Sequence, residues 1–164
     1  MARRPLRISN LRKGLKIDRP ALRRMIAALD AQMPWTCPPG ELSLVFVDTA
    51  EIIRLHDEFL EDPTVTDVIT FPGDTMDDPT DPEPFAGEIC VCADQAVREA
   101  PRHDFTPDDE LTLYVVHGWL HLAGHCDLTD EPRAAMRDAE KACLAMLRAK
   151  GLMPRYGFPP DCGA

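Results

Sequence analysis

Two histidines four residues apart are the residues of this chain best suited to metal chemistry. His117 and His121 lie in a segment whose apolar pattern predicts a helix, and a spacing of four places both imidazoles on one helix face. Two imidazoles on one face are the arrangement with which helices clamp a transition metal. Gly124 and a third histidine, His125, follow directly. The pattern therefore predicts a metal site at the carboxyl end of this helix.

The third protein ligand is expected to come from the residues after the helix. Gly124 favours a left-handed backbone conformation, which ends a helix and turns the chain back. Asp127, ten residues after His117, then stands where a returning chain can meet the metal, and a carboxylate oxygen is a normal zinc ligand. His125 is the alternative third ligand, because imidazole is the commoner metal-binding group. Three protein ligands leave one coordination position for water, as in catalytic zinc sites.

The residue after the first histidine bears on the class of hydrolase. Zinc proteases of the His-Glu-x-x-His type place a glutamate there as general base. Here the position is Gly118, which has no side chain. The sequence therefore disfavours that protease class and leaves water activation to the metal or to an acid from elsewhere in the fold.

Length and composition are those of one soluble domain. The chain has 164 residues, of which 45% are hydrophobic and 28% are charged. No apolar run approaches the roughly 18 residues that cross a bilayer and no secretory signal is visible, so we expect a cytoplasmic protein without a membrane partner. We expect one domain over residues 1–164, with residues 151–164 as a flexible tail. The six cysteines form no Cys-x-x-Cys pair, which argues against a cysteine zinc knuckle.

Charge is distributed unevenly along the sequence. The formal net charge is −10, which argues against wholesale nucleic-acid binding. Nine of the 18 lysines and arginines nevertheless fall in the first 24 residues, whereas residues 57–94 carry twelve acids and no basic residue. Such polarity lets one face meet a polyanion, and Arg12, Lys13 and Lys16 are the residues we expect to make that contact. The alternative is a solvated basic surface without a partner.

Hydrophobic periodicity predicts helices around a small sheet. Helices are expected over residues 20–33, 50–60, 94–100, 107–124 and 131–150, and strands over residues 6–9, 41–47, 66–71 and 87–92. The segment Thr106-Pro107-Asp108-Asp109 is a helix-start signature for the helix that carries the histidine pair. Strands in the middle with helices around them indicate an α+β domain with one sheet of about four strands, and a metal site at the end of a central helix.

Three segments together resemble the YbeY family of bacterial endoribonucleases, also called rRNA maturation factors. The segment from His117 to Asp127 resembles the family motif H-G-x-L-H-L-x-G-x-D-H. Residues 66–72 resemble the family strand T-D-V-L-S-F-P, and residues 87–92 resemble its strand G-D-I-x-I-x. Order and spacing agree from about Leu42 to Glu140.

The resemblance implies a mixed-sheet α+β fold, one transition metal per chain, usually zinc, and a role in processing 16S rRNA ends and in ribosome quality control. It implies single-stranded or ribosomal RNA as substrate and the ribosome or its small subunit as partner. The metal would polarise the phosphodiester and supply hydroxide. Asp67, in the matching strand, and Glu110, on the same helix as His117, are the acids expected to support the metal or the catalysis. The ordinary alternative is that both are solvent-exposed acids.

The chain departs from the family pattern at its third ligand and at an arginine. The third metal-binding histidine of the family falls on Asp127. The family's Tyr-Arg pair falls on Phe59 and Leu60, and leucine cannot stabilise an anionic transition state. The Asn of that helix falls on His56. Arg54, one turn earlier, is the candidate catalytic substitute for the missing arginine.

Two other functions stay open beside the metal-dependent endoribonuclease. The first is a metal hydrolase of another substrate, such as a peptide or an ester, which Gly118 weakens without excluding it. The second is a non-catalytic ribosome-assembly factor that retains a structural metal. Leu60 and Asp127, the departures from the family pattern, keep this second alternative open.

Overall fold

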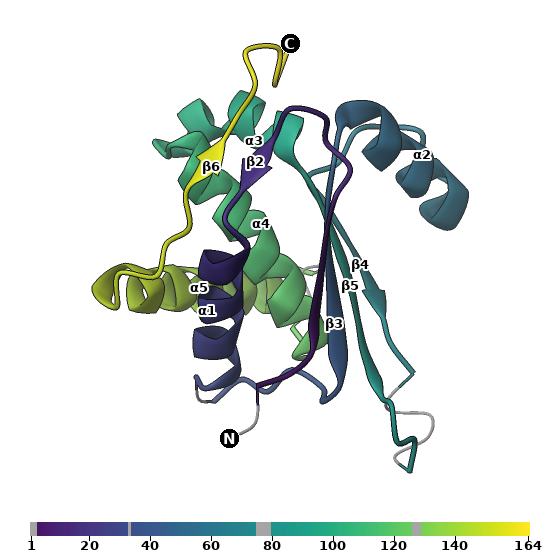
Figure 1. Ribbon diagram of the computed structural model, residues 1–164, viewed down its shortest axis with the longest axis vertical. Helices are drawn as coiled ribbons and strands as arrows, with labels where there is room; N and C mark the ends of the chain where they lie inside the picture. The colour runs from purple at the N-terminus through teal and green to yellow at the C-terminus, as the bar shows by residue number, and fades with distance from the viewer. Residues whose placement is uncertain (1–2, 33, 75–79, 126–128) are drawn as a thin grey trace.

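A four-stranded sheet forms the centre of the fold (Figure 1). The computed structural model describes residues 3–32, 34–74, 80–125 and 129–164 of the protein. Across the sheet the order is β1 (Leu6–Asn10), β3 (Glu41–Val47), β5 (Phe85–Cys92) and β4 (Val68–Pro72). The pairs β1–β3 and β3–β5 are parallel, and β4–β5 is antiparallel. The sheet is therefore mixed, as predicted, and β4 is one of its edges.

Helices cover both faces of this sheet (Figure 1). Three helices pack on one face: α1 (Arg19–Asp30), α4 (Pro107–Leu122) and α5 (Asp130–Ala149). On the same side, α3 (Ala93–Glu99) and the short 3-10 helix η1 (Ala100–His103) contact α4. The other face is covered by α2 (Thr49–Leu60), whose Ile52 joins a smaller core. Because helices lie on both sides, β3 reads as a nearly continuous apolar run.

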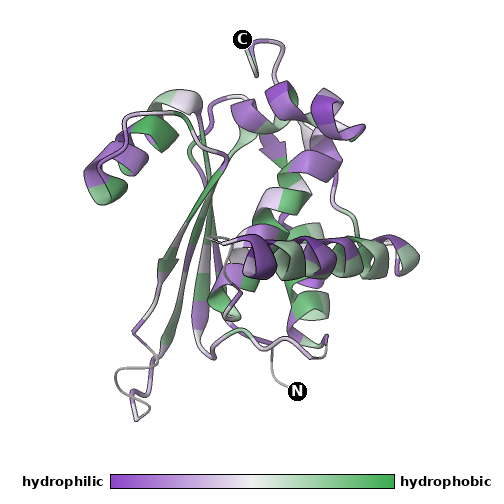
Figure 2. Cartoon of the chain, turned by 180° about the vertical axis from the view of Figure 1, so that it is seen from behind, coloured by the Kyte–Doolittle hydropathy of each residue, from purple (hydrophilic) through white to green (hydrophobic). Residues whose placement is uncertain are grey.

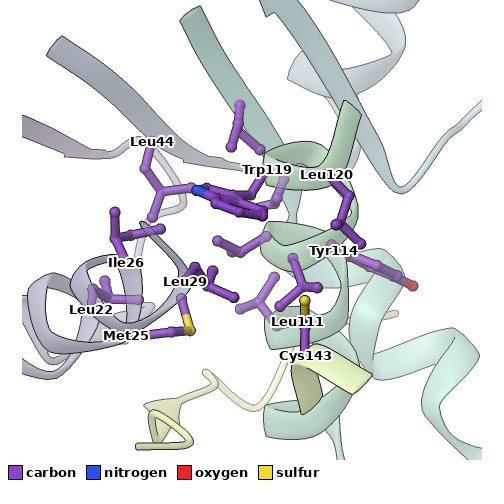
Figure 3. Packing of buried hydrophobic residues seen from close by; sticks show 14 of the residues in the cluster. Leu22, Met25, Ile26, Leu29, Leu44, Leu111, Tyr114, Trp119, Leu120 and Cys143 are labelled. Carbon is purple, nitrogen blue, oxygen red and sulfur yellow. The ribbon is translucent and has the colours of Figure 1, made fainter. Parts of the chain in front are cut away.

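The larger core lies between α1, α4 and the sheet (Figure 3). The predicted stripe of α1 is buried, and it consists of Leu22, Met25, Ile26 and Leu29. Trp119 of α4 is fully buried against it, and its indole N–H donates to Asp30 at 3.0 Å, so the buried polar atom has a partner. Figure 2 shows hydrophobic residues along the central strands and hydrophilic residues along much of the outer surface of the helices. This packing fixes α4 rigidly at the centre of the molecule.

The predicted elements occur close to their expected bounds. Helix α4 begins after Thr106, whose side chain accepts a hydrogen bond from the Asp109 amide, as the helix-start signature predicts. The helix ends at Leu122, two residues before Gly124. Among the described residues, no helix combines the length and the apolar character needed to span a membrane.

Residues 151–164 differ from the flexible tail that the sequence predicted. Within them β6 (Tyr156–Gly157) pairs antiparallel with β2 (Lys16–Ile17), a two-residue strand that the sequence analysis missed. The Gly163 amide donates to Asp94 at 3.0 Å. The segment is ordered by contacts with residues far away in the sequence, which its local composition does not reveal.

Candidate metal centre

The two predicted histidines lie side by side in the last two turns of α4. The ring centroids of His117 and His121 are 4.6 Å apart, and their Nε2 atoms are 3.0 Å apart. Two nitrogens that bind one tetrahedral zinc at about 2.1 Å stand roughly 3.4 Å from each other. The pair therefore presents two ring nitrogens at a separation that suits one metal ion.

Glu140 of α5 orients the first of these rings. Its Oε1 lies 2.5 Å from Nδ1 of His117. An ionised carboxylate can only accept, so Nδ1 carries the proton and Nε2 of the neutral ring offers its lone pair toward His121. A carboxylate behind a ligating histidine is a common support at metal sites. The sequence analysis missed Glu140, because no local pattern states which turn of α5 packs on His117.

The end of α4 has the left-handed glycine that the sequence predicts. Gly124 has a φ of +100°, in the range that favours glycine, and the His125 amide closes the helix end by donating to the Leu120 carbonyl at 2.9 Å. The ring of His125 lies 5.9 Å from that of Trp35. The predicted third ligand, Asp127, lies outside the described residues. Within the described ranges, no group of three or more His, Cys, Asp or Glu residues is placed to hold a metal.

The position of Gly118 explains why no general base follows the first histidine. A Cβ atom there would come within 2.5 Å of Ile89 Cγ2 and 3.2 Å of Thr70 Oγ1. Helix α4 thus packs closely on β5 and β4, and residue 118 faces the sheet. A glutamate at this position would enter the core and could not reach the histidine pair.

Two hollows meet at the histidine pair. The first has a volume of about 530 Å³ and lies between α4, α5 and η1. The second has a volume of about 660 Å³ and lies between α2, β4 and α4. His117 and Asp67 line both hollows, whereas His121 lines the second. The ring of His125 lines neither. The pair thus stands at the junction of a long depression.

The structure brings both predicted acids to this depression. The Asp67 carboxylate lies at the junction and accepts from the backbone N–H of the next residue at 2.8 Å. Glu110 is fully buried in the wall of the first hollow, with both carboxylate oxygens 2.9 Å from Nδ1 of His103. Burial raises the pKa of the neighbouring Tyr114, and the charges of Glu110 and Asp67 raise it further. The phenol is therefore neutral at physiological pH.

Arg54, the predicted substitute for the family arginine, lies away from both hollows. Its guanidinium is held by Glu51 at 2.7 Å and by Glu58 at 2.6 Å on the exposed side of α2. Phe59 and Leu60, which match the family's Tyr-Arg pair, do line the second hollow and are more than half exposed. The structure therefore places the matching position at the site and Arg54 outside it.

Several basic residues of the N-terminal region serve the fold. Arg12 is 8% exposed, and its guanidinium binds both carboxylate oxygens of Asp94 at 3.0 and 3.1 Å. Arg4 is bound in the same way to Asp30, at 2.6 and 3.0 Å. The expectation that Arg12 contacts a polyanion is therefore wrong, because its charge is buried and paired.

Together, these observations describe a mixed α+β fold in which two converging imidazoles lie beside a depression. The sequence matches the family model "Endoribonuclease YbeY" over residues 7–148. The chain therefore belongs to the YbeY family of endoribonucleases, which are hydrolases that cut within RNA chains.

Individual relatives agree with this assignment. The chain is 39% identical over 132 residues to "Endoribonuclease YbeY" of Protochlamydia amoebophila, which covers 80% of this chain and 85% of the relative. It is 31% identical over 146 residues to the protein of the same name from Chlamydia felis, which covers 87% of this chain and 90% of the relative. The solution structure of TM1509 from Thermotoga maritima superimposes with a TM-score of 0.54 at 24% identity, covering 95% and 98% of the two chains. This last likeness concerns the fold alone.

Proposed function

We propose that the protein is a metal-dependent endoribonuclease that cleaves single-stranded RNA in the maturation of ribosomal RNA, at the 3′ end of 16S rRNA, and in ribosome quality control. Its partners would be the ribosome or its small subunit, and its place the cytoplasm. Family membership supports the RNA substrate. The observation that carries the metal dependence is the convergence of two Nε2 atoms, 3.0 Å apart, on the junction of two hollows.

We propose one zinc ion per chain, bound by His117, His121 and Asp127. The left-handed conformation of Gly124 supports Asp127, because a chain can turn back from a helix end at such a glycine. The packing of His125 near Trp35 weighs against the alternative ligand. A transition metal bound there supplies Lewis acidity toward a phosphodiester oxygen and lowers the pKa of water.

The chain's own side chains have separate tasks in this proposal. Glu140 keeps the proton on Nδ1 of His117 and so holds Nε2 in its ligating form. Asp67, at the junction of the hollows, is placed to orient water or to accept its proton. Glu110 has no exposed surface, so it acts through His103 rather than on the substrate.

The test compares a zinc-loaded parent with single variants on a labelled single-stranded RNA. His117→Ala and His121→Ala should lose most of the bound metal and the cleavage, as should Asp127→Ala, whereas Asp127→His should keep the metal. His125→Ala is the matched control and should retain both metal and cleavage. Chelation of the parent should stop cleavage, and added zinc should restore it.

Each alternative predicts a different result. Full metal stoichiometry in both His117→Ala and His121→Ala would show that the site is elsewhere. A parent that binds zinc but cuts no RNA would favour the non-catalytic assembly factor, and turnover of a peptide or ester panel would favour a hydrolase of another substrate.

A further inference from the structure

We propose that Arg137 and Lys141 of α5 form a phosphate-binding subsite that holds the backbone of single-stranded RNA in the first hollow, beside the histidine pair. This inference rests on the proposed endoribonuclease function and adds the residues that grip the substrate. Both side chains line the first hollow together with His117.

Arg137 and Lys141 lie on the face of α5 that points toward His117. Arg137 and Lys141 are four residues apart, and Glu140 lies between them in sequence on the same side of α5. Glu140 reaches His117 with its carboxylate. The face of α5 that carries both cations is thus the face that lines the first hollow beside His117.

The charges of the two cations are free, whereas two of the three acids that line the hollow are bound to histidines. Within the described part of the chain, neither Arg137 nor Lys141 forms an ion pair or a side-chain hydrogen bond, and both are exposed. Two of the three acids that line the hollow have histidine partners: Glu110 binds His103 and Glu140 binds His117. The third, Asp67, accepts from the Val68 amide. The rim of the hollow therefore offers positive charge that a phosphate can take up.

Other cations nearby are already in use. Arg148 lies 3.5 Å from Asp109 and stacks over the Phe105 ring, and Arg133 pairs with Asp130 at 3.6 Å. The second hollow has no lysine or arginine among its described lining residues. A protein with a net charge of −10 needs unpaired cations at the site to hold a polyanion, and Arg137 and Lys141 supply two of them at the first hollow.

The remaining walls of the first hollow suit the rest of a nucleotide. Phe105, Leu113 and Leu144 also line it and add apolar surface beside the charged rim. Aromatic and apolar walls beside a basic rim are the means by which proteins bind single-stranded nucleic acid. The volume of about 530 Å³ falls in the range of about 300–1000 Å³ that small-ligand sites occupy. A ribose and base fit against the apolar side while the phosphates meet the cations.

The experiment measures binding of a short single-stranded RNA with 2′-O-methyl riboses and phosphorothioate linkages, which resist cleavage. Zinc-loaded parent, the double variant Arg137→Gln/Lys141→Gln and the control Lys150→Gln/Arg155→Gln are titrated by fluorescence anisotropy across a series of salt concentrations. The control removes the same charge from exposed residues that line neither hollow. Metal content and cleavage of an unmodified RNA are measured on the same preparations.

Loss of two phosphate contacts should weaken binding ~25-fold at 0.1 M salt and reduce the slope of log affinity against log salt by about 1.4, because each contact releases about 0.7 counterion from a single strand. Metal content should stay at the parental value, and the control should keep the parental slope. If the parent cleaves RNA but the double variant binds with parental affinity and slope, or the control loses as much, the subsite is refuted while the endoribonuclease proposal stands. A parent that neither binds nor cleaves RNA refutes both.

Discussion

Both the first 24 residues and the α5 residues at the edge of the first hollow carry positive charge. The two groups differ in whether that charge is paired with an acid. Arg12 is buried against Asp94 and tied to the fold, whereas Arg137 and Lys141 have no partner among the described residues and stand at the edge of the first hollow. Half of the chain's cations lie in the first 24 residues, yet the structure points to two cations of the last long helix. A cation is available to a ligand when no acid of the protein pairs with it. The number of cations in a stretch of sequence does not show whether they are paired.

The buried pair shows why an arginine inside a protein is rarely free. Moving a guanidinium out of water is costly unless a carboxylate compensates it. Burial alone would raise the pKa of Asp94, but hydrogen bonds from Arg12 and from the Gly163 amide outweigh burial and lower it. The pair therefore connects the N-terminal loop, the start of α3 and the C-terminal segment.

Among the variants that test this comparison, Arg12→Met should have the largest effect. Removal of one partner leaves the Asp94 charge buried and uncompensated, so we expect a loss of about 3–5 kcal/mol in the free energy of unfolding, measured by urea denaturation. Zinc content and RNA affinity should be parental at temperatures where the variant is folded. A stable variant with reduced RNA affinity would contradict the comparison, because Arg12 would then act as a binding residue.

In the parent, acid should remove the part of this stability that depends on the negative charge of Asp94. The pKa of folded Asp94 is below the value of about 3.9 for an unfolded Asp, so its stabilisation is fully present above that pH and is lost as pH falls through the folded pKa. Asp94→Asn should lack this part of the acid dependence. An unchanged pH profile between pH 5 and 2 would show that Asp94 does not carry it.

Glu140→Ala should have an intermediate effect, since Glu140 pairs with a functional group rather than with the core. Loss of a carboxylate behind a ligating histidine weakens metal binding by about 10- to 100-fold. Glu140→Gln, which can still accept from Nδ1–H, should lose less. Asp138→Asn on the exposed side of α5 is the matched control. Zinc affinity is measured by competition with a chelator, and the ¹⁵N shifts of His117 report its tautomer.

A parental zinc affinity in Glu140→Ala would show that the ring of His117 is oriented by other contacts. A reduced affinity with an unchanged tautomer would assign Glu140 a general stabilising role. Either result would show that Glu140, like Asp94, stabilises the fold and has no separate role at the histidine pair.

Local patterns predicted the parts of this molecule that depend on neighbours in sequence. The start of α4 at Thr106 and the left-handed conformation of Gly124 follow from capping chemistry that acts within one turn. The side-by-side placement of His117 and His121 follows from helix geometry. These features, together with the strand pattern, were sufficient for the fold class and for the position of the histidine pair.

Contacts between distant segments account for what the sequence did not predict. Glu140 meets His117 because α5 folds back across α4, and no spacing within either helix specifies that crossing. Tyr156 is fixed by pairing with Ile17, more than a hundred residues away. The burial of Arg12 depends in the same way on Asp94. Sequence identifies these side chains as charged or polar, and only the packing assigns them a partner.

Arg54 provides the mildest test, because it is exposed and yet fully paired. Its guanidinium is held between Glu51 and Glu58, and the side chain lines neither hollow. If pairing decides whether a cation is free for RNA, Arg54→Gln should leave cleavage and its salt dependence unchanged within error.

Leu60→Arg offers the contrast, since Leu60 lines the second hollow and is 59% exposed, so the new cation costs no core packing. We expect faster cleavage, by less than the ~10²-fold worth of a preorganised donor, because a long side chain at an exposed rim is not held in place. Rates are compared under single-turnover conditions at equal zinc content. A tenfold fall in Arg54→Gln would show that the ion pairs open to release Arg54 toward the substrate, and pairing in the free protein would then fail to identify the cations that bind RNA.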